Sequence, residues 1–219
     1  MSVFNFLQIA IHMSPFFYMA ADEPALGRID YASFSQQTLM EMVVENIEDV
    51  ERICGTRDDP LEIAEWGGVD CDEKGDVLRI DWSNEALKGS INWRWLPSTL
   101  VRIEIGFCEL SGALDLPRLP AGLRQMLIYD ANLTGPIDLS QLPAKLVELS
   151  FCINSLSGPI DLTRLPRCLE RLILALNEFT ANPTKGHLSV VGWTSTPVLG
   201  EAKNLFKPLV VFLSWRRPY

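Results

Sequence analysis

The sequence is poor in the residues that usually build metal sites. Among 219 residues there are five cysteines and only two histidines, His12 and His187, and no two cysteines form a C-x-x-C pair. Zinc sites usually combine such ligands at short, regular spacing. The sequence therefore predicts no metal site.

Catalytic motifs are also missing. The chain contains no glycine-rich nucleotide loop, no H-E-x-x-H, no G-x-S-x-G and no cysteine placed near a histidine. These motifs bring together the nucleophiles, bases and phosphate-binding groups that enzymes need. We therefore predict a protein that is not an enzyme and binds no small-molecule cofactor.

Basic charge is scarce, above all in the first third of the chain. The net charge is −9, and residues 1–72 hold 14 of the 28 acidic residues but only 3 of the 19 basic ones. Binding to nucleic acid normally needs a basic surface. Nucleic acid is therefore not expected as a partner.

Beyond the N-terminus, the chain has no charge-free apolar run of about 20 residues, the length that spans a bilayer. Residues 1–29 begin with an apolar stretch that ends in small residues before Asp22. It resembles a signal peptide but lacks a basic start, and His12 and Pro15 interrupt it. Two interpretations stay open: a secreted or surface protein, or an intracellular protein with a loosely ordered segment here.

The sequence does contain a regular repeat. A Leu-Pro pair recurs at every twenty-third position, beginning at Leu96, Leu119, Leu142 and Leu165. Glycine and a leucine two places before it keep the same period, at Gly89, Gly112, Gly135 and Gly158 and at Leu87, Leu110, Leu133 and Leu156. Three features with one period over about 100 residues predict a stack of similar units.

Within each unit the apolar residues follow L-x-x-L-x-L-x-x-N/C-x-L, seen most clearly from Leu146 to Leu156 and from Leu169 to Phe179. This pattern resembles the leucine-rich repeat family over residues 77–180, and the L-x-G-x-I that follows is similar to its plant-type subclass, also common in protists. The resemblance implies an α/β fold: a short solenoid of about five units over residues 74–182, with one parallel strand per unit and a horseshoe form.

The family pattern assigns each part of a unit a physical role. The L-x-L alternation forms a strand with one buried face, and the Asn or Cys satisfies backbone groups in the turn after it. In the unit "LTGPIDLSQLP", we expect Leu133, Ile137 and Leu139 to be buried and Gly135 to form the bend. The aspartates of this segment should cap short turns rather than bind cations: Asp115, Asp138 and Asp161.

Residues 30–73 should form a helical cap before the first unit. Apolar residues at three-to-five-residue spacing predict one amphipathic helix over residues 33–53, with Ser33 or Ser35 as its N-cap. Trp66, Gly68, Val69 and Cys71 then resemble the W-x-G-V-x-C signature of the plant-type N-terminal cap. That resemblance implies a disulfide between Cys71 and Cys54 if the protein is secreted, and two thiols if it is intracellular.

The repeat pattern stops at Thr180, and residues 183–219 do not recover it. This tail is apolar with a basic end. Two interpretations stay open: an irregular C-terminal cap over the last strand, or out-of-frame sequence after a truncation, which would leave a family member without independent function.

The resemblance also places a binding surface on the concave face of the solenoid, at the strand positions between the buried leucines. The N-terminal units carry charged pairs there and the later units carry apolar residues, which is typical of a protein interface. The residues expected to bind a partner are Arg79, Asp81, Arg102, Glu104, Phe107, Gln125, Leu127, Tyr129, Asp130, Ile153, Ile173 and Leu176. We therefore predict a protein-protein interaction module, or alternatively a secreted recognition fragment glycosylated at Asn132, the start of an N-x-T sequon.

Overall fold

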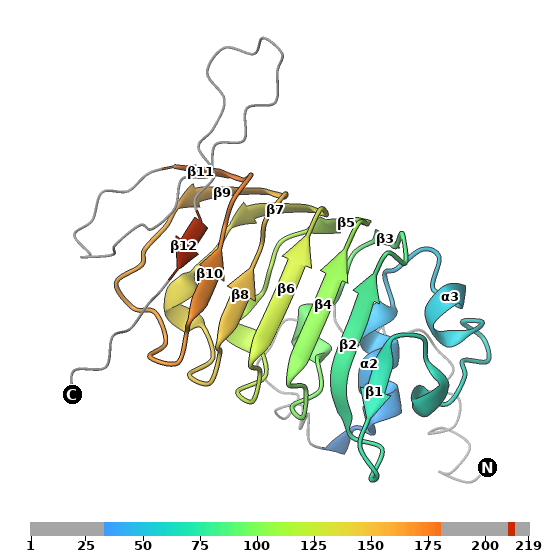
Figure 1. Cartoon of the computed structure of the whole chain (residues 1–219). Coiled ribbons are helices and arrows are strands. Elements are labelled where there is room, and N and C mark those ends of the chain that lie inside the picture. The colour runs from blue at the N-terminus through green and yellow to red at the C-terminus, as the bar shows by residue number, and fades with distance from the viewer. Residues whose placement is uncertain (1–32, 181–209, 213–219) are drawn as a thin grey trace, which may run out of the picture. The chain divides into compact units, whose positions relative to one another are not determined.

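The computed structural model describes residues 33–180 and 210–212 (Figure 1). Predictions that fall on residues 1–29 and on most of the tail lie outside them. The helical elements are α2 Gln36–Val44, α3 Glu51–Cys54, η3 Ile63–Glu65, η4 Trp93–Trp95, η5 Leu116–Arg118 and η6 Leu139–Gln141. The strands are β1 Val69–Cys71, β2 Val77–Ser83, β3 Lys88–Gly89, β4 Arg102–Gly106, β5 Glu109–Gly112, β6 Gln125–Tyr129, β7 Asn132–Pro136, β8 Glu148–Ser150, β9 Ser155–Pro159, β10 Arg171–Ile173, β11 Glu178–Thr180 and β12 Val210–Phe212.

The main sheet has seven strands in the order β1-β2-β4-β6-β8-β10-β12, seen side by side in Figure 1. The five strands from β2 to β10 are parallel, and each residue pairs with its equivalent in the next unit, as Ile80 does with Ile103. Residues 23 positions apart in the sequence are therefore paired between neighbouring strands. The solenoid architecture predicted from the sequence is confirmed.

The core lies behind this sheet and is built from the apolar positions of the repeat pattern. Leu146, Leu149 and Phe151 are all fully buried, and so are the matching residues of the next unit. Leu133 and Leu139 are each 1% exposed, and Ile137 is 7% exposed. No single unit could bury these side chains alone, so the core exists only because neighbouring units stack.

A second, five-stranded sheet runs in the order β11-β9-β7-β5-β3 along one end of the main strands (Figure 1). The periodic glycines lie in these short strands and all have positive φ, between 85° and 104°. Glycine adopts this region without the steric cost that a Cβ brings. The predicted bend at Gly135, where φ is 86°, is confirmed.

Asparagine side chains hold the turns between the two sheets. The Asn154 amide donates to the carbonyl oxygens of Ile128, Phe151 and Cys152 at 3.1–3.3 Å, and its oxygen accepts from the N–H of Leu133 at 3.2 Å. Asn177 repeats the arrangement one unit later. Each amide thus joins several backbone groups of the turn to those of the neighbouring unit.

The prediction of one continuous helix over residues 33–53 is wrong. Helix α2 ends at Val44, and the chain turns before α3 begins at Glu51, although the apolar residues predicted for one face are buried or partly buried. The interruption is held by pairing with β3: Ser90 N–H donates to the Asn46 carbonyl at 3.0 Å, and Glu48 N–H donates to the Lys88 carbonyl at 2.9 Å. The backbone between the helices therefore packs against the first unit instead of continuing the helix.

The N-terminus of α2 is capped as predicted, and residues at this end also contact the first units. Ser35 Oγ accepts from the N–H of Thr38 at 3.1 Å. Gln36 Oε1 accepts from the N–H of Val77, and the ring of Phe34 meets Trp95 edge-on, with 6.0 Å between centroids. Helix α2 thereby closes the open end of the core, which a solenoid requires.

Two of the three aspartates cap turns as predicted, and the third does not. Asp138 accepts from the N–H of Ser140 at 2.9 Å, and Asp161 accepts from the N–H of Thr163 at 2.8 Å. Asp115 makes no such bond and instead pairs with Arg118 at 3.2 Å. The reason is that the residue two places after Asp115 is a proline, which has no N–H to donate.

We expect the capping bonds to be visible in a titration. Hydrogen bonds from the Thr163 hydroxyl and N–H hold the pKa of Asp161 below its ordinary value. Replacing Thr163 with valine should raise that pKa part of the way back, as measured by NMR, and leave the pKa of Asp138 nearly unchanged. Since the folded-state pKa is depressed, ionised Asp161 stabilises the fold above its unfolded pKa, and this stabilisation is lost as pH falls through the folded value. An unaltered Asp161 titration in the variant would contradict the capping geometry.

Antiparallel strands flank the parallel ones at both edges of the main sheet. Strand β1 pairs with β2, and β12, Val210–Phe212, pairs with β10 so that Val210 lies opposite Ile173. Part of the tail thus covers the last parallel strand. Whether residues 183–219 as a whole form a cap stays a prediction, because the rest of them lie outside the described residues.

Candidate binding surface

The face of the main sheet that points away from the core carries the predicted binding residues in rows. The strand pairing joins Arg79, Arg102, Gln125, Glu148 and Arg171 into one row. A second row joins Asp81, Glu104, Leu127, Ser150 and Ile173. Equivalent residues of successive units therefore lie side by side, as the repeat period predicts. Ser150 is only 5% exposed, so it adds little to the surface of the second row.

Polar side chains link four of these strands in one chain of hydrogen bonds. Arg102 donates to Glu104 on its own strand and to Gln125 Oε1 on the next, at 2.6 Å. Gln125 in turn donates to Glu148 Oε2 at 3.1 Å, and Arg171 donates to Glu148 Oε1 at 2.6 Å. The network balances two cations against two carboxylates, so the charges of these four strands nearly cancel.

Tyr129 is the last residue of β6 and lies over a glycine of the neighbouring strand. A Cβ on Gly106 would lie 2.2 Å from the Tyr129 ring, so only glycine leaves room for it. The Tyr129 hydroxyl donates to Glu104 Oε1 at 3.2 Å, and its ring meets Phe107 edge-on at 5.4 Å between centroids. Gly106 thus fixes how this aromatic pair is presented.

Electrostatics of the face follow from these contacts. Partial burial by itself would raise the pKa of Asp81, but hydrogen bonds from Ser83 and Arg79 outweigh it, and the pKa lies below its ordinary value. The Ser83 hydroxyl would lower the pKa of Tyr129, yet burial and the nearby Glu104 carboxylate together raise it. Asp81 is therefore ionised and Tyr129 neutral at physiological pH.

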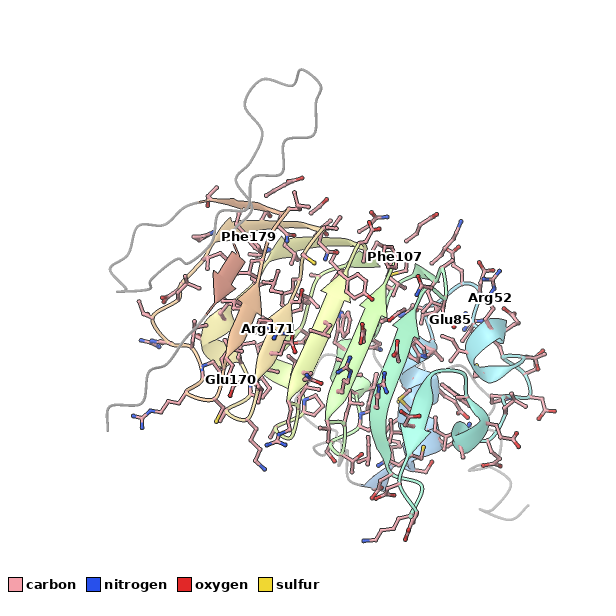
Figure 2. All side chains as sticks on the ribbon, viewed as in Figure 1. Arg52, Glu85, Phe107, Glu170, Arg171 and Phe179 are labelled. Atoms are coloured by element: carbon pink, nitrogen blue, oxygen red, sulfur yellow. The ribbon has the colours of Figure 1, made fainter. Side chains whose placement is uncertain are left out.

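Four of the residues expected to bind a partner, Phe107, Asp130, Ile153 and Leu176, do not lie on the strands. They follow the strand ends, as Asn84 does in the first unit, and all five residues adopt left-handed backbone conformations, with φ between 49° and 68°. We call these five residues the left-handed row. Figure 2 shows Phe107 and Glu85 at this end of the strands, and Glu170 at the other end. Three large apolar members are well exposed, with Phe107 at 54%, Ile153 at 44% and Leu176 at 53%.

The structure thus brings most of the predicted binding residues onto one face and its rim. The prediction omitted three residues that take part in the same contacts: Gly106, Glu148 and Arg171. Glu148 and Arg171 were detectable from the repeat period, since they continue the row of Arg102 and Gln125. Gly106 gave a weaker signal, a glycine placed one repeat before a tyrosine.

Other predicted sites lie elsewhere and stay predictions. Cys54 is a buried thiol and Cys71 a partly buried one, and burial raises the pKa of each. Asn132, the sequon residue, is exposed on β7. Within residues 33–180, no cluster of side chains could hold a metal ion, and no helix there is long and apolar enough to cross a membrane.

Comparison with family models and with curated proteins finds no match. Among solved structures, the BIR2 ectodomain from Arabidopsis thaliana is similar at 19% identity and a TM-score of 0.55, over 65% of this chain and 80% of that one. Pollen receptor kinase 3 is similar at 24% identity and a TM-score of 0.52, over 66% of this chain and 72% of that one.

A third similar structure is the leucine-rich repeat ectodomain of the Arabidopsis thaliana receptor kinase GASSHO1/SCHENGEN3, in complex with Casparian strip integrity factor 2. Identity is 23% and the TM-score 0.53, over 66% of this chain and only 18% of that one. At such identities the likeness concerns the fold alone. The chain is a leucine-rich repeat solenoid, with the fold found in plant receptor ectodomains.

Proposed function

We propose that this protein is a non-catalytic interaction module that binds a protein partner on the predicted concave face, which is the face of the main sheet that points away from the core and is called the outer face below. The observation that carries the proposal is the composition of that face. Solenoids use such extended sheet faces as binding surfaces. Here the face combines an arginine–carboxylate network with an aromatic pair and aliphatic side chains, and aromatic residues and arginine are enriched at protein interfaces.

The apolar residues of the face have no role in the core. Leu127 and Ile173 are partly exposed in the second row, whereas their strand neighbours Met126 and Leu172 are fully buried. A polar residue would fit this row equally well, since Asp81 and Glu104 occupy its first two positions. Apolar side chains that the fold does not require are best explained by a contact with another molecule.

Affinity purification with the full chain tests the proposal. Proteins that bind through the face should be recovered by the wild type and lost, by roughly tenfold or more, with either Leu127→Glu or Ile173→Glu, since each change places a charge in an apolar contact. Leu61→Glu is the matched control, because Leu61 is also an exposed leucine, 44% accessible, but lies before the first unit. Circular dichroism checks that all three variants are folded. Equal recovery with wild type and both face variants would refute the outer face as the binding surface.

A further inference from the structure

The left-handed row contains large apolar residues at positions where neither burial nor the backbone conformation favours them. Its conformation is imposed by the fold, because the turn continues the hydrogen bonds between units: Phe107 N–H donates to the Tyr129 carbonyl, and Ile153 N–H to the Ala175 carbonyl at 3.0 Å. Left-handed conformations favour Gly, Asn and Asp, and they are most strained for β-branched residues. Asn84 and Asp130 obey this preference.

Phe107, Ile153 and Leu176 do not obey it, and Ile153 is β-branched. All three are also among the five exposed large hydrophobic residues of the described chain. Each position therefore accepts both backbone strain and exposed apolar surface, where asparagine would avoid both. Backbone strain that is kept at exposed positions is characteristic of functional sites.

The charges around the row have one sign. The five turns that carry it, 84–86, 107–109, 130–132, 153–155 and 176–178, contain four acidic residues and no lysine or arginine. Of the acids, Glu109 is paired with Lys88 at 3.3 Å, while Asp130 and Glu178 form no ion pair with the residues that the structure describes. A partner that covers this row should therefore be apolar where it faces the aliphatic side chains and basic where it faces Asp130.

The spacing of the row identifies the shape of that partner. Successive units are about 4.8 Å apart, so Ile153 lies roughly 10 Å from Phe107 along the stack and Leu176 roughly 14 Å. An α-helix rises about 1.5 Å per residue, so residues i, i+7 and i+10 match these three positions, and i+3 matches Asp130. In an extended chain, side chains on one face recur only every second residue, at intervals of about 6.6 Å, which does not match.

We propose that the left-handed row docks a basic amphipathic helix of a partner protein, with apolar residues at i, i+7 and i+10 and Lys or Arg at i+3. The four helix positions fall within one stripe of about 80°. This inference rests on the proposed function, since it names a partner class for the rim of the same face. It assigns Phe107, Ile153 and Leu176 to apolar contacts and Asp130 to an ion pair.

Direct binding of designed peptides to the full chain tests the inference. The probe is a synthetic helical peptide of about 18 residues, held helical by a lactam bridge, with Leu at i, i+7 and i+10 and Lys at i+3. Fluorescence anisotropy should show that Glu in place of Lys weakens binding by roughly tenfold, and that Ser in place of the three Leu abolishes it. Asp130→Lys in the chain should reverse the preference, so that the Glu peptide binds more tightly than the Lys peptide.

Variants of the chain separate docking from folding. Ile153→Asn and Leu176→Asn should each weaken the Lys peptide by roughly tenfold or more while the melting temperature stays equal or rises, because asparagine suits the left-handed conformation. Leu61→Asn should change neither. Loss of thermal stability in both row variants would mean that these side chains serve the fold, and the inference would fail.

Three other results would also overturn it. Equal affinity for the Lys and Glu peptides would remove the role of Asp130, and no binding of either peptide to the full chain would show that the row is covered or inert. Concentration-dependent dimers that Ile153→Asn abolishes would identify a second copy of the chain as the occupant. In each case, recovery of a partner that depends on Leu127 and Ile173 would leave the proposed function standing.

Discussion

Replacing Gly89 with alanine is expected to lower the free energy of unfolding by roughly 4 kcal/mol, the largest effect that we predict. Gly89 has φ 97°, and an added Cβ would lie 2.1 Å from the Asn46 carbonyl oxygen. That oxygen accepts the hydrogen bond from Ser90 that joins the helical region to the first unit. The methyl group must therefore separate α2 from the solenoid and expose the end of the core, including Ile47.

Gly135→Ala is the matched control. Gly135 has a similar φ of 86°, but an added Cβ would meet only the Ala113 methyl at 3.7 Å, an ordinary contact. Its cost should be the backbone strain alone, about 1 kcal/mol. Urea unfolding of the full-length variants, followed by circular dichroism, gives both values. Equal losses for the two variants would show that the contact with Asn46 is not what makes Gly89 necessary.

Replacing Asn154 with alanine should cost about 3 kcal/mol, the second-largest loss that we predict. The change removes four hydrogen bonds at once and leaves the N–H of Leu133 and the carbonyl of Ile128 without their side-chain partner, while the Phe151 carbonyl keeps the bond from Asn177. Unpaired backbone groups in a partly buried turn each cost about 1–3 kcal/mol, and entry of water offsets part of the sum.

Asn154→Asp tests whether the side chain is needed as a donor to the three carbonyls. The carboxylate could still accept from Leu133, but it would turn an oxygen toward three carbonyl oxygens, so the loss at neutral pH should be at least as large as for alanine. Asn132→Ala is the control, since Asn132 is exposed and a surface change of this kind costs about 0.5 kcal/mol or less. Chemical denaturation of the three variants measures this; an Asn154→Ala chain within 1 kcal/mol of wild type, roughly, would contradict the role of the amide.

The predicted single helix over residues 33–53 is wrong because of backbone pairing between distant segments. The apolar spacing of residues 33–53 fits one helix, and those residues are indeed buried or partly buried, but the chain between α2 and α3 pairs with β3, far along the sequence. A periodic pattern reports which side chains are buried and not which backbone groups are paired. The cap expected at Asp115 is a different case, because Pro117 is visible in the sequence and already excludes it.

The candidate binding surface was likewise predicted in part from the sequence and in part only seen in the structure. The repeat period identified the rows of Arg102 and Leu127, because parallel stacking must place equivalent residues side by side. It also gave Phe107, Ile153 and Leu176 a common position, but as strand residues. Only the structure shows that this position is left-handed and that Tyr129 lies over Gly106.

The sequence by itself determined the solenoid, its period, its core and the alignment of its units, because one repeating pattern of apolar residues can be buried only by stacking. The tertiary structure decided how the chain closes at its first unit, which aspartates cap, and which exposed apolar side chains are held against backbone strain. These features depend on single contacts between residues far apart in the chain, such as Gly89 with Asn46, and on backbone angles that side-chain periodicity does not encode.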